Sequence, residues 1–250
     1  MNDDGESFAN DWKGLVRHVK KEASELVLLP EMPFYGWFAV APTFDRGIWD
    51  KAVAAHQNWI GRLVELGPAA VLGTRPINRK GRRLNEGFSW EEGRKATGVH
   101  LKSYLPDEEG YHEASWYHRG DRRFSPFGIS DCKVGMMICS DLWAMSHARA
   151  YGKKGAHIIA VPFAAPKPSM ERWVAGGKVA AVISGAFCVA SNRTGTIDGV
   201  EFGGCGWVIG PDAKVLGLTS GDKPFVTVEI DLREAEAAKK TYPRDALRPD

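Results

Sequence analysis

The stretch Lys133–Trp143 reads KVGMMICSDLW, and the interpretation of the whole sequence depends on it. A basic residue precedes a short apolar run, which changes abruptly to Cys139, Ser140 and Asp141. Such a run is typical of a strand buried on both faces of a parallel sheet. Because open α/β sheets bind ligands at the carboxyl ends of their strands, the pattern predicts Cys139 in a ligand crevice. A free cysteine is also a common core residue, so its function depends on other residues.

The composition predicts one large domain and disfavours a nucleic-acid or membrane-surface protein. The chain has 250 residues, 44% of them hydrophobic and 26% charged, which is enough for a substantial core in a single domain spanning residues 1–250. Lys and Arg number 33 and Asp and Glu 31, which leaves a formal net charge of +2. The cations are scattered along the sequence, so we expect neither nucleic acid nor membrane as a partner.

The cysteines and the first residues indicate a reducing compartment. No CxxC pair occurs, and a chain of this size does not need disulfides. The opening MNDDGESFANDWKG is acidic and polar, whereas a secretory signal is basic and then apolar. No apolar stretch reaches the length that spans a bilayer. We therefore expect a cytoplasmic protein in which three cysteines serve packing: Cys132, Cys188 and Cys205.

Helical and strand patterns alternate along the chain, which favours an α/β layered fold over an all-α or all-β fold. The patterns predict helices over 8–24, 47–66, 145–155, 169–185 and 232–240. They predict strands over 25–30, 69–74, 98–106, 133–138, 156–162, 186–192, 205–210 and 225–231. Turn signals beside short alternating segments indicate hairpins within 75–130.

Two further reactive side chains have the same kind of position as Cys139. Glu31 lies just past the strand predicted over 25–30, and Lys102 lies near the end of the strand predicted over 98–106. Glu113 follows Lys102 in a loop rich in charged and aromatic residues. Taken singly, a carboxylate there is compatible with a turn, and a lysine usually extends its ammonium to water.

Glu31, Lys102 and Cys139 together offer the groups that nucleophilic catalysis requires. A cysteine that attacks a carbonyl or nitrile carbon needs a base, a positive charge for the oxyanion and an acid for the leaving group. The histidines show no metal-ligand spacing such as HExxH, and a glycine-rich phosphate loop is absent from the sequence. We therefore expect an enzyme without a metal or cofactor.

These motifs make the sequence resemble the nitrilase superfamily of carbon–nitrogen hydrolases over most of its length. The resemblance is carried by LLPEMPFYGW around Glu31, by KSYLPDEEGYHE, by VGMMICSDLW, by ARAYGKKGAHIIAVP, by ASNRTG and by FGGCGWVIGPDAKVLG. The spacing from Lys102 to Glu113 is similar to that of the carbamoylputrescine amidase branch. The resemblance implies a four-layer α-β-β-α sandwich that forms a homodimer or a higher homo-oligomer.

The resemblance also implies the roles of the site residues. Glu31, Lys102 and Cys139 match the catalytic triad, with Glu113 as the second glutamate. Glu31 is expected to act as general base and then acid. Lys102 and the backbone N–H of Ser140 are expected to stabilise the oxyanion, with the lysine charge favouring the thiolate. Asn192 and Arg193 are expected to form a turn that supports the site. Four aromatic residues are candidates to line an apolar pocket: Tyr35, Trp37, Trp143 and Phe163.

Three features depart from the family pattern. The chain begins almost directly in the first helix, so the first strand of the fold is apparently missing. Nitrilases proper usually carry Trp and Glu after the cysteine, whereas Ser140 and Asp141 stand here, which favours amide substrates. Leu142 and Trp143 stand where enzymes for N-carbamoyl-D-amino acids carry two arginines, which disfavours such substrates.

The leading hypothesis is a hydrolase that acts on a non-peptide amide or carbamoyl-amide bond of a small linear substrate through a cysteine thioester, releasing ammonia or an amine. A nitrilase that converts a nitrile to an acid is the second hypothesis. A third is a catalytically silent dimeric scaffold of the same fold. A papain-like pairing of Cys139 with one of the seven histidines also stays open, and it would make Lys102 dispensable.

Overall fold

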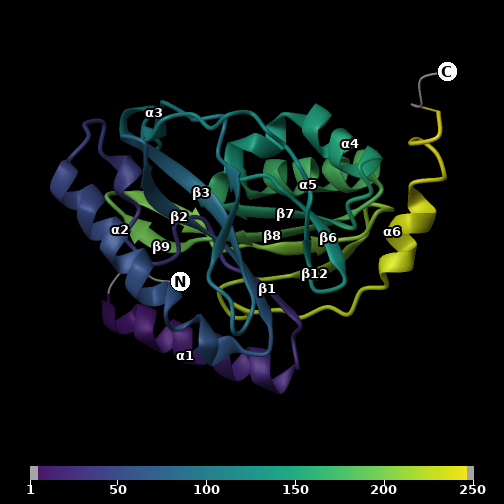
Figure 1. The fold of residues 1–250 in the computed structure, drawn as a ribbon, viewed down its shortest axis with the longest axis horizontal. Coiled ribbons are helices and arrows are strands. Elements are labelled where there is room, and N and C mark those ends of the chain that lie inside the picture. The colour runs from purple at the N-terminus through teal and green to yellow at the C-terminus, as the bar shows by residue number, and fades with distance from the viewer. Residues whose placement is uncertain (1–4, 247–250) are drawn as a thin grey trace.

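A computed structural model describes residues 5–246 of the chain and places two β-sheets face to face between two layers of helices (Figure 1). The first sheet has the order β1-β2-β3-β4, with β1 and β2 parallel and the other pairs antiparallel. Its strands are β1 (Leu26–Leu28), β2 (Ala70–Arg79), β3 (Arg82–Trp90) and β4 (Thr97–Leu101). The expected four-layer α-β-β-α sandwich is therefore confirmed.

The second sheet has six strands in the order β12-β11-β8-β7-β6-β5. The three central strands β6, β7 and β8 are parallel, and antiparallel strands flank them. A separate hairpin, β9 with β10, lies beyond β8 in sequence. The bounds are β5 (Phe127–Ile129), β6 (Cys132–Met136), β7 (Ile158–Phe163), β8 (Phe187–Asn192), β9 (Thr194–Ile197), β10 (Val200–Gly203), β11 (Trp207–Ile209) and β12 (Val215–Leu218).

Helices cover the outer face of each sheet (Figure 1). Helices α1 and α2 pack on the first sheet, and α4 and α5 pack on the second. Short 3₁₀ segments join several elements, and α6 follows the last strand. The bounds are α1 (Gly5–Lys21), α2 (Arg46–Ile60), α3 (Glu113–Trp116), α4 (Met145–Lys153), α5 (Met170–Ser184) and α6 (Leu232–Ala238).

Alternate residues of the first sheet face different layers, which explains why its strands are apolar on both faces. Val27 and Val71 belong to the cluster that α1 covers. Ala70 and Leu72 belong to the larger cluster, which also contains Met136 of the second sheet. Because side chains alternate along a strand, each strand contributes to both layers of the core.

The structure corrects several boundaries. The predicted strand 225–231 is not a strand: its Thr227 Oγ1 hydrogen-bonds His18 Nε2 at 3.0 Å and Ser24 Oγ at 2.7 Å, and the segment joins no sheet. Alternating apolar residues indicate that one face of a segment is buried. A β-strand also requires backbone hydrogen bonds to an adjacent strand. The sequence patterns also missed β12 and the β9–β10 hairpin. The second helix ends at Ile60 instead of continuing to 66.

Within residues 5–246 the chain enters α1 before any strand, as expected from the sequence. No helix in this range combines the length and the apolar character that a bilayer crossing requires.

Candidate active site

Cys139 lies in a strained turn at the end of the central strand β6. The ladder between β6 and β7 continues past Met136, because Met137 N donates to Ala160 O at 2.9 Å. Cys139 then opens a 3₁₀ turn, Cys139–Trp143, with φ of +49°. A non-glycine residue in this region costs of order 1–3 kcal/mol, so the surrounding contacts must hold it there. The side chain is buried, with its Sγ 3.7 Å from Ala164 O.

Lys102 follows β4 immediately and is fully enclosed by the protein. Its backbone N donates to Asn85 O at 3.0 Å, which extends the pairing of β4 with β3 by one residue. Its Nζ lies 2.8 Å from Glu31 Oε1. It also lies 2.7 Å from Oε1 and 2.6 Å from Oε2 of Glu113. An ammonium has three N–H donors. One hydrogen bond to each of the two carboxylates leaves the third N–H of Lys102 available for another acceptor.

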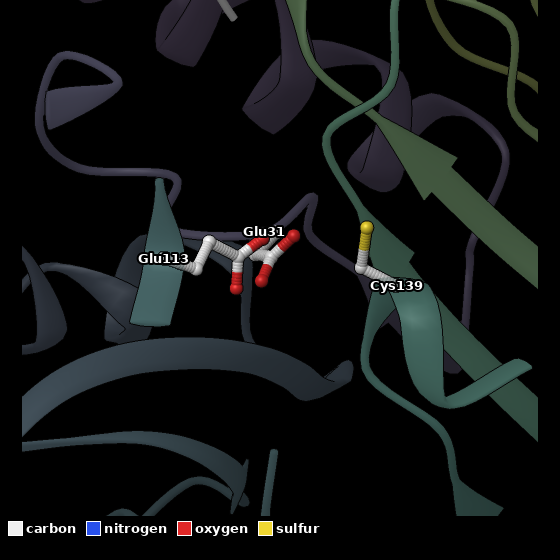
Figure 2. A group of neighbouring side chains, drawn as sticks. All are labelled: Glu31, Glu113 and Cys139. Carbon is white, nitrogen blue, oxygen red and sulfur yellow. The ribbon is translucent and has the colours of Figure 1, made fainter. Parts of the chain in front are cut away.

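Glu31 and Glu113 face Cys139 from the opposite side of the site (Figure 2). Glu31 follows β1 by three residues, and Glu113 is the first residue of α3. One oxygen of each carboxylate and the sulfur of Cys139 all lie within 4.8 Å of one another. Three stretches that are far apart in sequence therefore place their reactive atoms together, with Lys102 bridging the carboxylates.

The carboxylates and the ammonium perturb one another strongly. Burial, opposed by the charge of Lys102 and assisted by the negative charge of Glu31, raises the pKa of Glu113 to about 8. Burial alone would lower the pKa of Lys102, but the charges of Cys139, Glu113 and Glu31 outweigh burial and raise it. Lys102 therefore stays cationic, while the glutamate pair resists carrying two negative charges.

The electrostatics favour a neutral thiol at rest. Burial raises the pKa of Cys139 well above its ordinary value, and Glu31 and Glu113 act in the same direction. Lys102 opposes this shift, as expected from the sequence, but does not overcome it. A neutral thiol needs a base nearby in order to react. Glu31 Oε2 is buried and makes no hydrogen bond within the described part of the chain, so it is free to accept that proton.

The charge of Lys102 disfavours a metal ion at this position. Glu31, Glu113 and Cys139 have suitable ligand atoms close together, but the ammonium of Lys102 already occupies the centre of the carboxylate pair. A cation added beside it would be repelled at short range.

The contacts also argue against a papain-like pairing. Two buried or half-buried histidines near the turn have other partners: His100 Nε2 bonds Asp141 Oδ2 at 2.8 Å, and His147 Nε2 bonds the Tyr104 hydroxyl at 3.0 Å. The groups that shift the pKa of Cys139 are Lys102, Glu31 and Glu113, together with the Ala164 carbonyl.

Asn85 was missed by sequence analysis. This buried residue of β3 donates from Nδ2 to Glu31 Oε1 at 2.7 Å, and its carbonyl accepts from Lys102 N. The sequence feature that could have identified Asn85 is its position as a lone asparagine inside the strand-like RRLNEGFSW. A buried side-chain amide requires hydrogen-bond partners.

Arg193 and Asn192 contact the segments that carry Glu31 and Ala165, but Asn192 ends β8 and does not lie in the expected turn. Arg193 donates to the backbone carbonyls of Glu31 and Tyr35 at 3.1 and 2.9 Å, and also to Met32 O. Asn192 Oδ1 accepts from Ala165 N at 3.0 Å, one residue after the carbonyl that contacts Cys139. The hydroxyl of Ser140 donates to Tyr104 O.

The four predicted pocket aromatics have different surroundings. Trp37 is buried and donates from Nε1 to Gly110 O at 3.1 Å. Phe163 packs on Trp173 and Trp207 in the core. Trp143 is 43% exposed and packs on Trp173 of α5, while Tyr35 packs near Phe38. Their contact with a substrate stays a prediction.

Sequence analysis also did not identify Tyr111 and Tyr117, two tyrosines near the site. The hydroxyls of Tyr111 and Tyr117 are buried without a hydrogen-bond partner among residues 5–246. Burial raises the pKa of both, and the negative charges of Cys139, Glu31 and Glu113 add to the effect. Gly110 and His112, the residues on either side of Tyr111 in sequence, line a cavity of about 800 Å³. The rest of its wall comprises Val40, Ala41, Pro42, Glu109, Asp198, Gly199 and Val200.

Sequence comparisons identify the family of the chain. The family model for carbon-nitrogen hydrolases matches residues 2–240. A nitrilase from Pyrococcus abyssi is 33% identical over 227 residues, covering 87% of this chain and 81% of that protein. A glutamine-dependent NAD(+) synthetase from Rhodobacter capsulatus is 27% identical over 90% of this chain, and an N-carbamoylputrescine amidase from Oryza sativa is 31% identical over 57%. These two matches span only 40% and 52% of the relatives' own lengths.

Solved structures share the fold. A carbon-nitrogen hydrolase from Helicobacter pylori aligns with a TM-score of 0.87 at 24% identity, covering 99% of this chain and 92% of that chain. An amidase from Nesterenkonia sp. aligns with a TM-score of 0.74 at 18% identity, covering 88% and 82%. The family model spans nearly the whole sequence and the P. abyssi relative most of both chains. This chain therefore belongs to the carbon–nitrogen hydrolase family, the nitrilase superfamily.

Proposed function

We propose that this hydrolase cleaves a non-peptide amide or carbamoyl-amide bond of a small linear substrate through a thioester on Cys139. The observation that carries the proposal is the approach of the Cys139 sulfur to Glu31 and Glu113 within 4.8 Å, with Lys102 bridging the two carboxylates. A nucleophile, a base and a cation in one buried site are the components of acyl transfer.

In the first half-reaction, Glu31 accepts the proton of the Cys139 thiol as the sulfur attacks the carbonyl carbon. The remaining donor of Lys102 and the backbone N–H of Ser140 stabilise the negative oxygen that develops. Glu31 then returns the proton to the leaving nitrogen, and the carbon–nitrogen bond breaks. Ammonia or an amine leaves, and the acyl group remains on sulfur. Glu113 holds Lys102 and offers an acceptor for the N–H groups of the substrate.

In the second half-reaction, water attacks the thioester while Glu31 takes its proton. The tetrahedral intermediate has the same negative oxygen, so Lys102 and Ser140 stabilise it again. When the carbon–sulfur bond breaks, Glu31 returns the proton to Cys139 and the acid leaves. Each cycle consumes one water and leaves every protein group in its starting protonation state.

A nitrile is the second candidate substrate, and the 33% identity to the nitrilase from P. abyssi supports it. Against it, Ser140 and Asp141 follow the cysteine, a pattern that resembles amidases. Assaying a nitrile beside its matching amide separates the two. A chain that hydrolyses neither, with Cys139 unreactive, would fit the third candidate, a silent scaffold.

We further propose that the chain forms a single domain, since the family model covers residues 2–240 without a break. The homodimer stays a prediction that the molar mass in solution would test.

The decisive experiment measures turnover of small amides, ureas and nitriles alongside alkylation of the cysteines by iodoacetamide. We expect Cys139 to react faster than the other three cysteines. Glu31→Gln should slow both alkylation and turnover, by about 100-fold or more for turnover, because it removes the base. Cys139→Ser should abolish thioester formation, which mass spectrometry of the acylated protein would detect.

Two exposed or half-exposed positions provide controls. Cys205→Ser removes a thiol outside the site, and Glu22→Gln removes an exposed carboxylate just past the end of α1. Both should leave turnover unchanged. Equal alkylation of all four cysteines, or full turnover in Glu31→Gln, would refute the proposed function.

A further inference from the structure

The carboxylate of Asp141 is fully buried two residues after Cys139 and has no role in the steps above. Its Oδ1 accepts from the backbone N of Ser103 at 3.1 Å and of Tyr104 at 3.0 Å. Its Oδ2 accepts from Ile138 N at 3.2 Å and from His100 Nε2 at 2.8 Å. Three of these donors are backbone N–H groups that can only donate, so the carboxylate accepts.

These four contacts bracket two catalytic residues. Ile138 directly precedes Cys139, and Asp141 itself lies two residues after it. His100 lies two residues before Lys102, and Ser103 directly follows it. One carboxylate therefore fixes the chain on both sides of the nucleophile and on both sides of the lysine.

The same contacts join the two sheets at the site. Lys102 N bonds Asn85 O, which ties the lysine to β3 in the first sheet. Met137 N bonds Ala160 O, which ties the cysteine turn to β7 in the second sheet. Those ladders hold each residue within its own sheet, whereas Asp141 reaches from one sheet to the other. The Ser140 hydroxyl makes a second link of this kind to Tyr104 O.

His100 completes the arrangement from the first sheet. It belongs to β4, is buried, and its ring packs on Phe124 with centroids 4.7 Å apart. The packing orients Nε2 toward Asp141, so the fourth hydrogen bond comes from a fixed side chain. The four contacts occupy both oxygens of the buried carboxylate, so Asp141 acts on the site through its neighbours.

We propose that Asp141, held by His100, is a positioning residue that sets the separation between the Cys139 thiol and the Lys102 ammonium by joining the two sheets. This inference rests on the function proposed above. Catalysis depends on that separation, because attacking atom and oxyanion donor must fit one transition state.

Asp141→Asn tests the proposal because it preserves the shape of the side chain. The remaining oxygen can still accept from Ser103 and Tyr104, but the new NH₂ group faces the N–H of Ile138 and the donor of His100. We expect kcat, calculated per folded molecule as counted by titration of Cys139, to fall about 100-fold. Small misplacements of catalytic groups have effects of that size. KM should stay near the wild-type value, because the substrate contacts remain.

A purely structural role would give a different result. The variant would unfold more readily, but each folded molecule, counted by titration of Cys139, would retain the wild-type kcat. That outcome would overturn the proposal. Asp131→Asn is the matched control, since Asp131 is exposed in the turn that leads into β6. It should leave kcat and KM unchanged.

Substitutions at His100 keep the test decisive if Asp141→Asn does not fold. His100→Leu removes the donor to Asp141, whereas His100→Gln retains an N–H at a similar reach. We expect the glutamine variant to restore most of the kcat that the leucine variant loses. Equal kcat in the two variants would count against the proposal.

Alkylation separates this inference from the proposed function. If the wild-type chain hydrolyses no amide, urea or nitrile, the proposed function fails, but the iodoacetamide rate at Cys139 can still be compared. We expect Asp141→Asn to slow that rate by at least about tenfold, because the thiol loses its alignment with Glu31 and Lys102. Unchanged alkylation in the folded variant would overturn the inference by itself.

Discussion

The guanidinium of Arg193 donates a 3.1 Å hydrogen bond to the backbone carbonyl of Glu31, although 162 residues separate the two in sequence. The same side chain donates to Met32 O and Tyr35 O, so three carbonyls of one turn converge on it. Arg193 is buried, with 1% of its surface exposed. The turn that carries Glu31, the proposed general base, is therefore held in place by the residue that directly follows β8.

Arg193→Lys should destabilise the fold and disturb the site. A lysine retains the positive charge but lacks the planar fork that reaches several carbonyls at once. Leaving buried carbonyls without donors costs about 1–3 kcal/mol for each group, so we expect the free energy of unfolding to fall by at least about 2 kcal/mol. Urea unfolding measures this, and iodoacetamide labelling of Cys139 should also slow.

Arg123→Lys is the matched control for that substitution. Arg123 is exposed and lies 3.6 Å from Asp121, and exposed pairs contribute little. Its unfolding free energy should stay within about 0.5 kcal/mol of wild type. A similar loss in both variants would mean that the converging carbonyls do not explain the role of Arg193.

The sequence was sufficient to predict that the three proposed reactive residues meet in one site, because their positions at strand ends are local features. Glu31, Lys102 and Cys139 each follow a short apolar run, and the carboxyl end of such a run is the site-forming edge of a sheet. The roles of Asn85 and Asp141 were not accessible in this way. Each depends on which segments lie side by side, and a single sequence does not specify that pairing.

The segment 225–231 illustrates the same limit within the fold. Its alternation correctly indicates that one face is more buried than the other, since Val226, Val228 and Ile230 are half-buried whereas Thr227 and Glu229 between them are exposed. Whether such a segment becomes a strand depends on a backbone edge contributed by another part of the chain. Residues 215–218 show the opposite error: the strand predicted over 205–210 is confirmed as β11, but its antiparallel partner β12 was not predicted.

Glu113→Gln should change how stability depends on pH. The folded-state pKa of Glu113 is raised from 4.5 to about 8 by burial, so its contribution to stability is fully present below 4.5 and is lost as pH rises toward 8. Glutamine resembles the protonated acid and does not titrate. Relative to wild type, the variant should therefore gain about 1 kcal/mol for each pH unit across this window.

Urea unfolding of both proteins at several pH values between 5 and 8 checks this prediction, with Glu109→Gln as an exposed control. The control should follow the wild-type curve. A wild-type chain whose stability rises through this window relative to Glu113→Gln would show that Glu113 is ionised in the folded state.

His56 should produce the opposite dependence at acid pH. Burial lowers its pKa from 6.5 to about 3, and its Nδ1 lies 2.7 Å from Ala52 O while its Nε2 accepts from Phe34 N. A lowered folded-state pKa contributes stability that is present above 6.5 and lost as pH falls toward 3. His56→Gln cannot titrate, so its unfolding free energy should fall less steeply than that of wild type.

Thermal or urea unfolding between pH 7 and pH 4 measures the two slopes. His118→Gln, at an exposed position, should retain the wild-type slope. Parallel curves for His56→Gln and wild type would mean that folding does not lower the pKa of His56.

Gly152→Ala should destabilise the contact between α4 and α5. A Cβ built at Gly152 would lie 2.1 Å from the backbone oxygen of Ser184 and 2.7 Å from its Cα, so no side-chain rotation can relieve the clash. Forcing the helices apart should lower the unfolding free energy by about 1–3 kcal/mol, measured by urea unfolding. Gly128→Ala is the control, because a Cβ there meets nothing within 4 Å and should change stability by less than about 0.5 kcal/mol. Equal stability of the two variants would show that the helices separate at no cost and that close approach at Gly152 is not required for the fold.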